Sequence, residues 1–370
     1  MLIHLFDDEK FVDSTIDKFE LVGTGKNRYI VFSNTKELNH PQNLSKIEIL
    51  PNDYRKLDFN KIYNNCDVLA IHYLTPIKIH LLKHKPNHIK VIWMVWGKDA
   101  YDYYKSFQQY EKRTQKILRN DFKALLKTSF LYRVHHLMKY GVFPINYEKK
   151  ALKNINYLAT VLPTEFEGIK NEFQLNVEYV KFSYDSLTTV LLNDSEINLG
   201  KDIIVGNSAT PTNNHLDIFH KIKPSARVLV PLNYGDMSYA TKIEKEGYDI
   251  FGDSFVPIKE FFSFEDYKKL VFSCNTMIMY HIRQQGLGNI LLALYGGIRV
   301  FLNQKSPLYS FLKNHDFYVF DLDKDFTLIG IELSSDEIQI NRQKVSQYWG
   351  VESILEGTRN VMKIHENQSI

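Results

Sequence analysis

Short apolar runs alternate along this chain with longer stretches in which apolar residues recur at helical spacing. The short runs predict buried strands of parallel sheets, and the amphipathic stretches predict the helices that connect them. In the first half, the sequence predicts strands at residues 2–6, 29–33, 46–50, 68–73, 91–95, 156–161 and 177–182. In the second half, it predicts strands at 203–205, 228–230, 276–280, 298–302 and 318–320, and helices near 213–222, 264–273, 290–295 and 341–364.

A polar stretch between residues 183 and 202 interrupts this alternation and predicts a domain boundary. We therefore expect a first domain at 1–190, a second at 200–340, and a C-terminal helix at 341–370 that packs back toward the first. Two βα-repeating halves predict an α/β fold with two doubly wound, Rossmann-like sheets that face a cleft. In such folds ligands bind beyond the carboxyl ends of the strands.

Composition and charge exclude several classes of protein. A chain of 370 residues is long enough for two domains with their own cores, and 44% hydrophobic with 24% charged residues is typical of a folded globular protein. The net charge of +3 is too small by itself to indicate a polyanionic partner. Cys66 and Cys274 form no CxxC pair, and no secretion signal or membrane-spanning apolar stretch is visible. These features predict a cytoplasmic location.

The segment 283–289 has the features of a diphosphate clamp between a strand and a helix. Gly286 and Gly288 allow close approach of a ligand to the backbone, and a helix beginning near Asn289 directs free N–H groups and its positive end at that ligand. Arg283 adds a fixed charge with forked donors for phosphate oxygens. The alternative is an ordinary strand-to-helix turn whose glycines only permit tight packing.

Two further loops of the second half carry donors for the same ligand. Asn207 and Ser208 follow the strand at 203–205 and can donate hydrogen bonds to phosphate or sugar oxygens. Tyr234 can stack on the base of a bound nucleotide or close over that ligand. Three residues in or near these loops also have a purely structural interpretation. Asn213 fits a helix N-cap, His215 fits a core histidine in the first helical turn, and Tyr234 fits a turn tyrosine.

In the first half, Asp99 is the leading candidate for a general base. It follows the apolar strand at 91–95, and a group transfer that inverts a carbon centre needs a carboxylate or histidine to take a proton from the acceptor hydroxyl. Its alternative role is to cap the helix that starts nearby. His72 ends the strand at 68–73 and is a second candidate. Asp7 and Asp8, after the first strand, form a third option.

Residues 105–153 carry twelve Lys or Arg against three Asp or Glu, interleaved with apolar side chains, and 107–139 is strongly helical in character. A basic amphipathic helix suits an anionic membrane surface, at about 1 kcal/mol per basic residue near the lipid. The alternative is a basic helix that faces only solvent. No nucleic-acid-binding motif accompanies it. We expect peripheral binding to the inner face of the cytoplasmic membrane and no nucleic-acid partner.

Several of these segments resemble a known family when taken together. Val205-Gly206-Asn207-Ser208, the helix start at Asn213 and His215, and Arg283-Gln284-Gln285-Gly286-Leu287-Gly288 resemble the bacterial 4-acetamido-4,6-dideoxygalactosyltransferases of enterobacterial common antigen synthesis, glycosyltransferase family 56. Trp96-Gly97-Lys98-Asp99-Ala100-Tyr101 is similar to that family's Trp-Gly-x-Asp-x-Tyr segment. The resemblance runs from about residue 68 to the C-terminal helix.

The resemblance implies a GT-B glycosyltransferase with a dTDP-sugar donor, 4-acetamido-4,6-dideoxygalactose or a related deoxysugar, and a polyprenyl-diphosphate-linked glycan acceptor. The donor would contact Asn207, Ser208, Tyr234, Arg283, Gln284, Gln285, Gly286, Gly288 and Asn289. Asp321-Leu322-Asp323 has the form of a metal-binding Asp-x-Asp pair, but GT-B enzymes use a helix dipole and Arg instead. We therefore expect a surface turn there, no metal and no cofactor. The alternatives are a nucleotide-sugar 2-epimerase of the same fold and a non-catalytic sugar-nucleotide- or RNA-binding module.

Overall fold

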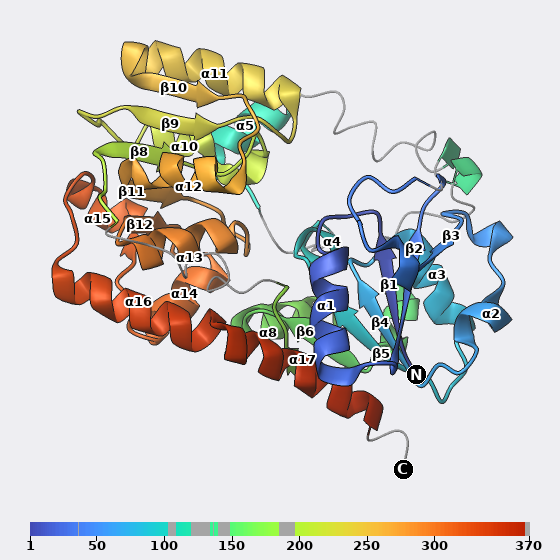
Figure 1. The fold of residues 1–370 in the computed structure, drawn as a ribbon. Coiled ribbons are helices and arrows are strands. Elements are labelled where there is room, and N and C mark those ends of the chain that lie inside the picture. The colour runs from blue at the N-terminus through green and yellow to red at the C-terminus, as the bar shows by residue number, and fades with distance from the viewer. Residues whose placement is uncertain are drawn as a thin grey trace. The chain divides into compact units, whose positions relative to one another are not determined.

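The computed structural model describes residues 1–35, 37–102, 109–119, 134–135, 137–139, 149–184 and 197–366 of the chain. The chain forms two compact units, each with a parallel sheet and covering helices (Figure 1). Unit 1 comprises Met1–Phe107, Phe122–Asp185 and Val351–Ile370, and unit 2 comprises Gln108–Asp121 and Ser186–Gly350. The predicted α/β fold with two doubly wound sheets is confirmed.

Unit 1 contains a seven-stranded parallel sheet. Its strands are β1 (Leu2–Asp7), β2 (Asn27–Phe32), β3 (Ile47–Leu50), β4 (Val68–His72), β5 (Lys90–Met94), β6 (Tyr157–Thr160) and β7 (Glu178–Lys181). They lie in the order β3-β2-β1-β4-β5-β6-β7. The winding direction changes between β1 and β4, and such a switch point is where doubly wound sheets bind ligands.

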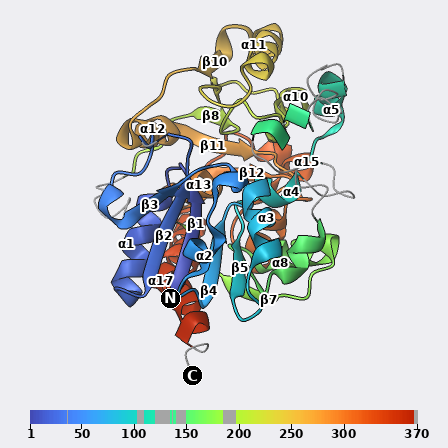
Figure 2. The same ribbon diagram turned by 90° about the vertical axis from the view of Figure 1, so that its right-hand side faces the viewer.

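Helices cover both faces of this sheet. They are α1 (Val12–Gly23), α2 (Phe59–Tyr63), α3 (Pro76–His84), α4 (Lys98–Tyr101), α8 (Pro163–Phe173) and α17 (Val351–Glu366). Because side chains alternate along a strand, Ile3 and Leu5 of β1 pack with α2, α3 and α8, whereas Leu2 and Phe6 pack with α1 and α17. Figure 2 shows α2 and α3 in front of the sheet and α17 behind it.

Unit 2 contains a six-stranded parallel sheet. Its strands are β8 (Asp202–Val205), β9 (Val228–Pro231), β10 (Phe255–Ile258), β11 (Cys274–Met279), β12 (Arg299–Leu302) and β13 (Phe320–Asp321). Their order is β10-β9-β8-β11-β12-β13, the order of nucleotide-binding doubly wound folds, with the switch point between β8 and β11. In Figure 1, β10, β9, β8, β11 and β12 lie one below another.

The sequence predicts a further helix-strand unit after residue 230 that ends near residue 251, whereas in the structure a helix extends to Phe251 and β10 follows it, in a short apolar run that contains Pro257. Proline has no N–H to donate, so it is tolerated only where a sheet bond is not needed. β10 lies at the edge of the sheet, where one side of the strand has no neighbouring strand among the described residues.

Helices also cover the sheet of unit 2. They are α5 (Lys112–Arg119), α10 (His215–Phe219), α11 (Met237–Phe251), α12 (Phe264–Phe272), α13 (Leu287–Gly296), α14 (Pro307–Asn314), α15 (Leu322–Asp325) and α16 (Ser335–Trp349). One of them comes from the first half of the chain. The sequence places residues 108–121 in the first domain, whereas the structure places them in unit 2. The reason is a set of polar contacts between residues about a hundred positions apart, described below.

The C-terminal segment also differs from the sequence prediction. A single helix at 341–364 is predicted, but α16 ends at Trp349 and α17 begins at Val351. A Cβ at Gly350 would lie 2.3 Å from the carbonyl oxygen of Ser346, so this position excludes other side chains. α16 packs on α13 in unit 2, and α17 packs on α1 and β7 in unit 1. Within the described ranges, no helix has the length and apolar character needed to cross a membrane.

Candidate active site

The loops after β8 and β11 form the first candidate site, and both leave the carboxyl edge of the unit 2 sheet. β8 pairs with β11 in parallel, so the ends of the two strands lie next to each other. The predicted donor residues 207–208 follow β8, and 283–289 follow β11. The sequence prediction therefore places both segments at the switch point, and the structure brings them into contact.

The helix α13 begins closer to Arg283 than predicted. Its first residue is Leu287 and its N-cap is Gly286, in the left-handed conformation with φ 68° and ψ 25°. The first backbone bond of the helix runs from Ile290 N to Gly286 O. The N–H groups of residues 287–289 consequently have no partner within the helix, and they mark its positive end. Gly288 is exposed, and a Cβ there would meet nothing within 4 Å.

Arg283 and Gln285 connect the two loops through side-chain hydrogen bonds. Arg283 Nε donates to Gln285 Oε1 at 3.0 Å, and Thr212 Oγ1 donates to the same oxygen at 2.6 Å. Gln285 Nε2 donates in turn to Asn207 Oδ1 at 3.3 Å. Tyr234, 46% exposed, lies beside this group, with its hydroxyl 3.5 Å from Asn207 Nδ2. These contacts fix the side chain of Arg283, which is 8% exposed, between the two loops.

We call the set of Asn207, Ser208, Tyr234, Arg283, Gln285 and Gly286 the β8–β11 site. The predicted residues Gln284, Gly288 and Asn289 lie in the same loop and in the first turn of α13, partly or fully exposed. The structure thus gathers the predicted donor residues at one sheet edge. Their contact with a donor remains a prediction.

Asn213 holds the β8 loop in place and is not the helix N-cap that the sequence suggests. The N-cap of α10 is Asn214, which has a positive φ of 56°. Asn213 Oδ1 accepts from Asn207 N at 3.0 Å and lies 2.8 Å from His281 Nε2. Because this oxygen only accepts, His281 must carry its proton on Nε2. Burial, and then Arg283 and His215, lower the pKa of His281 to about 3, so it is neutral here.

The glycine at position 206 is required by the same contacts. Gly206 has φ +71°, and a Cβ there would lie 2.6 Å from His215 Nε2 and 2.8 Å from Asn213 Oδ1. His215 is fully buried in the first turn of α10, which matches the core alternative. His281 and Thr212 are the residues in contact with this site that sequence reasoning misses. The position of His281, directly before the Arg283 motif, is the signal that would have found it.

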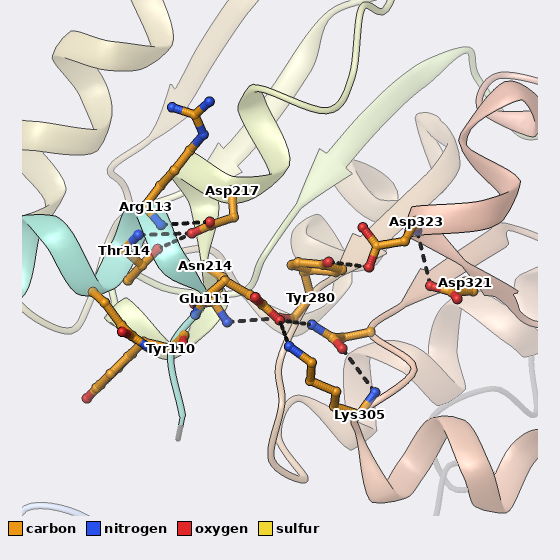
Figure 3. Close-up of polar contacts among 12 residues, drawn as sticks. Tyr110, Glu111, Arg113, Thr114, Asn214, Asp217, Tyr280, Lys305, Asp321 and Asp323 are labelled. Carbon is orange, nitrogen blue, oxygen red and sulfur yellow. Dashed lines mark hydrogen bonds and ion pairs between the residues drawn. The ribbon is translucent and has the colours of Figure 1, made fainter. Parts of the chain in front are cut away.

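A segment from the first half of the chain, the strap (residues 109–119), is fastened beside this site. Asp217 of α10 points at the first turn of α5 (Figure 3). Its carboxylate accepts from Arg113 N at 2.9 Å, Thr114 N at 3.0 Å and Thr114 Oγ1 at 2.8 Å. Asp217 therefore serves α5 as an N-terminal cap supplied from elsewhere in the chain.

Glu111 connects the start of the strap to two loops of unit 2, the one before α10 and the one after β12. Its N–H donates to Asn214 Oδ1 at 2.8 Å, and its carboxylate accepts from Asn303 Nδ2 at 3.0 Å and Lys305 Nζ at 2.8 Å. Asn214 also donates to the carbonyl of Tyr280, the first residue after β11, at 3.0 Å. Asn214 therefore contacts both the strap and the start of the loop that carries Arg283 (Figure 3).

In unit 1, Asp99 holds two loops together. It is 3% exposed, and its carboxylate accepts from Leu74 N at 2.9 Å, Trp93 Nε1 at 2.8 Å and Trp96 N at 3.0 Å. Burial raises its pKa, and these hydrogen bonds oppose the rise. Three donors occupy the carboxylate, so its geometry is that of a positioning residue for the loops after β4 and β5. Its role as a base remains a prediction.

His72, the second candidate base, is also enclosed. It is fully buried, with Nε2 3.0 Å from His4 Nδ1 and Nδ1 2.8 Å from the hydroxyl of Tyr184. Its ring stacks on Phe6, with centroids 3.9 Å apart. Burial, with the nearby His4, lowers the pKa of His72 well below its usual value. Both ring nitrogens have protein partners, so an acceptor would have to displace one of them.

The Asp-x-Asp segment is not a plain surface turn. Asp321 is fully buried and caps α15 by accepting from Asp323 N at 3.1 Å, which corrects the surface-turn prediction for this residue. Asp323 accepts from Tyr280 at 2.5 Å and pairs with Lys221. In the part of the chain that is described, no group of three or more His, Cys, Asp or Glu side chains is gathered as a metal site would need.

The basic stretch at 105–153 is described only in part. α5 exposes Lys112, Arg113 and Lys116, while Ile117 packs against the core of unit 2. The next residues that are described at length begin at Lys149, in unit 1. The rest of the predicted membrane-binding helix, residues 120–133 and 140–148, lies outside the described residues.

Residues 170–349 match a known family, described as 4-alpha-L-fucosyltransferase glycosyl transferase group 56. This range contains every residue of the β8–β11 site. The resemblance seen at 205–208 and 283–288 is thereby confirmed. The match does not reach residues 96–101, so the resemblance expected there, from about residue 68 onward, is wider than the family match.

Solved structures resemble the whole chain. The UDP-forming α,α-trehalose-phosphate synthase of Burkholderia xenovorans has a TM-score of 0.64 at 9% identity, over 100% of this chain and 99% of that chain. The sucrose-phosphate synthase of Thermosynechococcus elongatus has a TM-score of 0.62 at 10% identity, over 99% of both chains. The trehalose-6-phosphate structure from E. coli bound with UDP-2-fluoro glucose has a TM-score of 0.61 at 8% identity, over 100% and 99%.

Identities this low show a shared fold, which in these structures is the GT-B fold. The family match adds the class of reaction and favours glycosyl transfer over the epimerase and the non-catalytic module. The chain is a glycosyltransferase with the GT-B fold, similar over residues 170–349 to glycosyltransferase group 56.

Proposed function

We propose that this glycosyltransferase moves a deoxyamino sugar, such as 4-acetamido-4,6-dideoxygalactose, from a dTDP-linked donor to a polyprenyl-diphosphate-linked glycan. The observation that carries the proposal is the β8–β11 site. There a buried guanidinium, a left-handed glycine and the free N–H groups of α13 meet at the switch point of a doubly wound sheet. A nucleoside diphosphate is the ligand class that needs this combination.

The chemistry of transfer places negative charge at this site. As the bond from the sugar to the diphosphate breaks, its electron pair stays on the diphosphate oxygen. Arg283 and the positive end of α13 would stabilise that charge, which is the kind of contribution that often dominates catalysis. We therefore expect no metal or other cofactor to be needed, and transfer in the presence of a chelator tests that expectation.

Aromatic side chains near the site support a nucleotide with a stacked base. The loops after β9 and β10 are joined by Leu232 N to Ile258 O at 2.8 Å and by Asn233 Nδ2 to Glu260 O at 3.1 Å. The first of these loops carries Tyr234, and the second carries Phe261, 76% exposed. Exposed rings of this kind stack readily on a base.

A thermal-shift panel with dTDP, UDP, GDP and ADP tests the donor class. A ligand that binds only the folded protein raises the free energy of unfolding, by about 2.7 kcal/mol at a ligand concentration a hundredfold above Kd. The melting temperature rises accordingly. We expect dTDP to give the largest shift and its 4-acetamido-4,6-dideoxygalactose conjugate to be consumed when glycan acceptor is added. A larger shift with another nucleotide would refute the dTDP assignment, and no shift with any would refute the donor site.

For the acceptor, we propose that the protein meets its lipid-linked glycan at the inner face of the cytoplasmic membrane. The exposed cations Lys112, Arg113 and Lys116 on α5 support electrostatic attraction to anionic lipid, worth about 1 kcal/mol each. The test is sedimentation with phosphatidylglycerol vesicles. Replacing these three residues by Gln should release the protein. Replacing a matched set of exposed cations of unit 2, Lys223, Lys245 and Lys313, should not. If both sets of replacements release the protein from the vesicles equally, membrane binding is not specific to the face that carries α5.

A further inference from the structure

Three consecutive carboxylates lie at the carboxyl end of β1, beginning with its last residue Asp7, and they differ in their partners. Asp7 pairs with the fully buried Lys78 at 2.5 Å. Asp8 accepts from Asn39 N at 2.8 Å and from Asn39 Nδ2 at 2.7 Å. Glu9 is different, since its Oε1 is buried and no described residue donates a hydrogen bond to it.

A buried carboxylate oxygen without a donor is costly, so such a group is retained where it has a function. Glu9 lies near a group of aromatic side chains, one of which, Tyr184, interacts with it electrostatically. The half-buried rings of Phe11, Trp96 and Tyr184 lie together, with centroids 4.9 to 5.3 Å apart. Tyr73, at the end of the neighbouring strand β4, has a positive φ of 58°, a strained conformation for a bulky residue.

We propose that Glu9 is the general base of this glycosyltransferase, and this inference rests on the function proposed above. In the step, the O–H bond of the acceptor hydroxyl breaks and its proton passes to the Glu9 carboxylate. The hydroxyl oxygen forms the new bond to the anomeric carbon. The bond from that carbon to the diphosphate breaks, and its electron pair leaves with the nucleoside diphosphate. The transfer inverts the anomeric centre.

The other candidates in unit 1 are less suited to this role because their polar atoms are occupied. Asp99 accepts three hydrogen bonds from protein donors, and both nitrogens of His72 have protein partners. Asp7 is neutralised by Lys78, which also donates to the carbonyl of His72 at 2.6 Å. Asp8 accepts three hydrogen bonds from Asn39 and His40, whereas Oε1 of Glu9 is buried without a donor among the described residues.

The electrostatic environment keeps Glu9 able to exchange a proton near neutral pH. Burial raises the pKa of Glu9 to about 8, opposed by Lys78 of α3 and reinforced by nearby carboxylates. The charged and titratable groups that face it are Lys78, Asp7, Asp8, Asp99 and the Tyr184 hydroxyl. Because a base acts in its ionised form, kcat should rise with pH up to about 8 and then level off.

The test measures dTDP release from dTDP-linked 4-acetamido-4,6-dideoxygalactose with polyprenyl-diphosphate-linked glycan in detergent micelles. We expect Glu9→Gln to bind dTDP as the wild type does and to lower kcat by about 10²- to 10⁴-fold. Formate should restore part of the rate of Glu9→Ala, which a merely structural role would not produce. The control is Asp17→Asn, which removes an exposed carboxylate of α1 and should leave rate and pH profile unchanged.

A Glu9→Gln variant that keeps the wild-type kcat and pH profile would overturn the inference. A wild-type protein that releases no dTDP would contradict the proposed function instead. In that case infrared titration of the carboxyl band that disappears in Glu9→Gln decides the remaining question. Ionisation near pH 8 would sustain the inference, and ionisation at the ordinary pH of a glutamate would overturn it.

Discussion

At the scale of single residues, the two glycines of the Gly286-Leu287-Gly288 segment have different roles. Gly286 has a positive φ and caps α13, so its conformation requires glycine. Gly288 lies in the first turn of the helix, in open space. The sequence indicates close backbone approach at both positions. It does not reveal that Gly206 is the second position where the backbone leaves no room for a side chain, because His215 and Asn213 come close to Gly206 only in the folded protein.

Gly288→Ala should separate stability from binding. Alanine favours a helix over glycine by up to about 1 kcal/mol, and nothing in the protein opposes the added methyl, so the free energy of unfolding should rise. The same methyl would occupy space at the free N–H groups and weaken nucleotide binding. Urea unfolding and calorimetric titration of the same preparation measure the two effects.

Gly206→Ala is the matched contrast to that variant. Its methyl would meet His215 and Asn213 at positive φ, so we expect a loss of about 1–3 kcal/mol of stability together with weaker binding. Weakened binding in Gly288→Ala accompanied by a similar loss of stability would show that this position is structural rather than part of the ligand site.

At the scale of elements, the sequence predicts what a local pattern specifies. The strands of both sheets follow from their apolar runs, except that β10, whose run contains Pro257, lies beyond residue 251, where the sequence predicts this helix-strand unit to end. The place of α5 is different. Its attachment to unit 2 rests on Asp217 and Asn214, about a hundred residues further along the chain, and no local pattern encodes such a contact. The break between α16 and α17 depends on one glycine, Gly350, whose backbone role is visible only in three dimensions.

Asp217→Ala should loosen α5 without unfolding unit 2. The change removes three hydrogen bonds from the first turn of the helix, and loss of a cap costs about 0.5–2 kcal/mol. We expect faster tryptic cleavage after Lys112, Arg113 and Lys116, measured by mass spectrometry. The control is Asp236→Ala, which removes the cap of α11 at Ser238 N and Tyr239 N. Equal cleavage of the strap in both variants would contradict the assigned role of Asp217.

At the scale of the whole molecule, the two units share the same kind of sheet and the same place for polar side chains. Both sheets are doubly wound, both have a switch point beside their first strand, and both gather polar side chains at that edge. The fold, and the meeting of the candidate donor residues at one sheet edge, follow from the sequence because apolar runs and the Arg283 motif are local. The base that we propose could not be predicted in the same way. Asp99 and Glu9 look alike in sequence, and only their hydrogen-bond partners separate them.

Each unit also buries neutral histidines, which predicts a pH dependence of stability. Burial lowers the pKa of His4 in unit 1 and of His215 and His281 in unit 2 to about 3. Protons therefore bind these histidines more tightly in the unfolded chain than in the folded protein. The stability that these groups contribute is therefore complete above the unfolded pKa of about 6.5 and is lost as pH falls toward 3, by up to about 1.4 kcal/mol per pH unit for each histidine.

Melting temperatures between pH 7.5 and 5 measure this effect. We expect a steady fall with decreasing pH, and a smaller fall in His4→Phe, whose ring would fit among Phe6, Phe19 and Tyr29. His220→Gln, at an exposed position, should leave the slope unchanged. A melting temperature that does not change over this range would show that the buried histidines are not neutral in the folded protein.

The most direct test of the account is a calorimetric titration of the β8–β11 site with the nucleoside diphosphate that gives the largest thermal shift. The comparison is between the wild type, Arg283→Ala and Arg227→Ala. Arg227 pairs with Asp202, the first residue of β8. Losing a charge-assisted hydrogen bond of about 1.5–3 kcal/mol should weaken binding by roughly ten- to a hundredfold in Arg283→Ala alone. Equal affinity of the wild type and Arg283→Ala would contradict the assignment of this site to the donor.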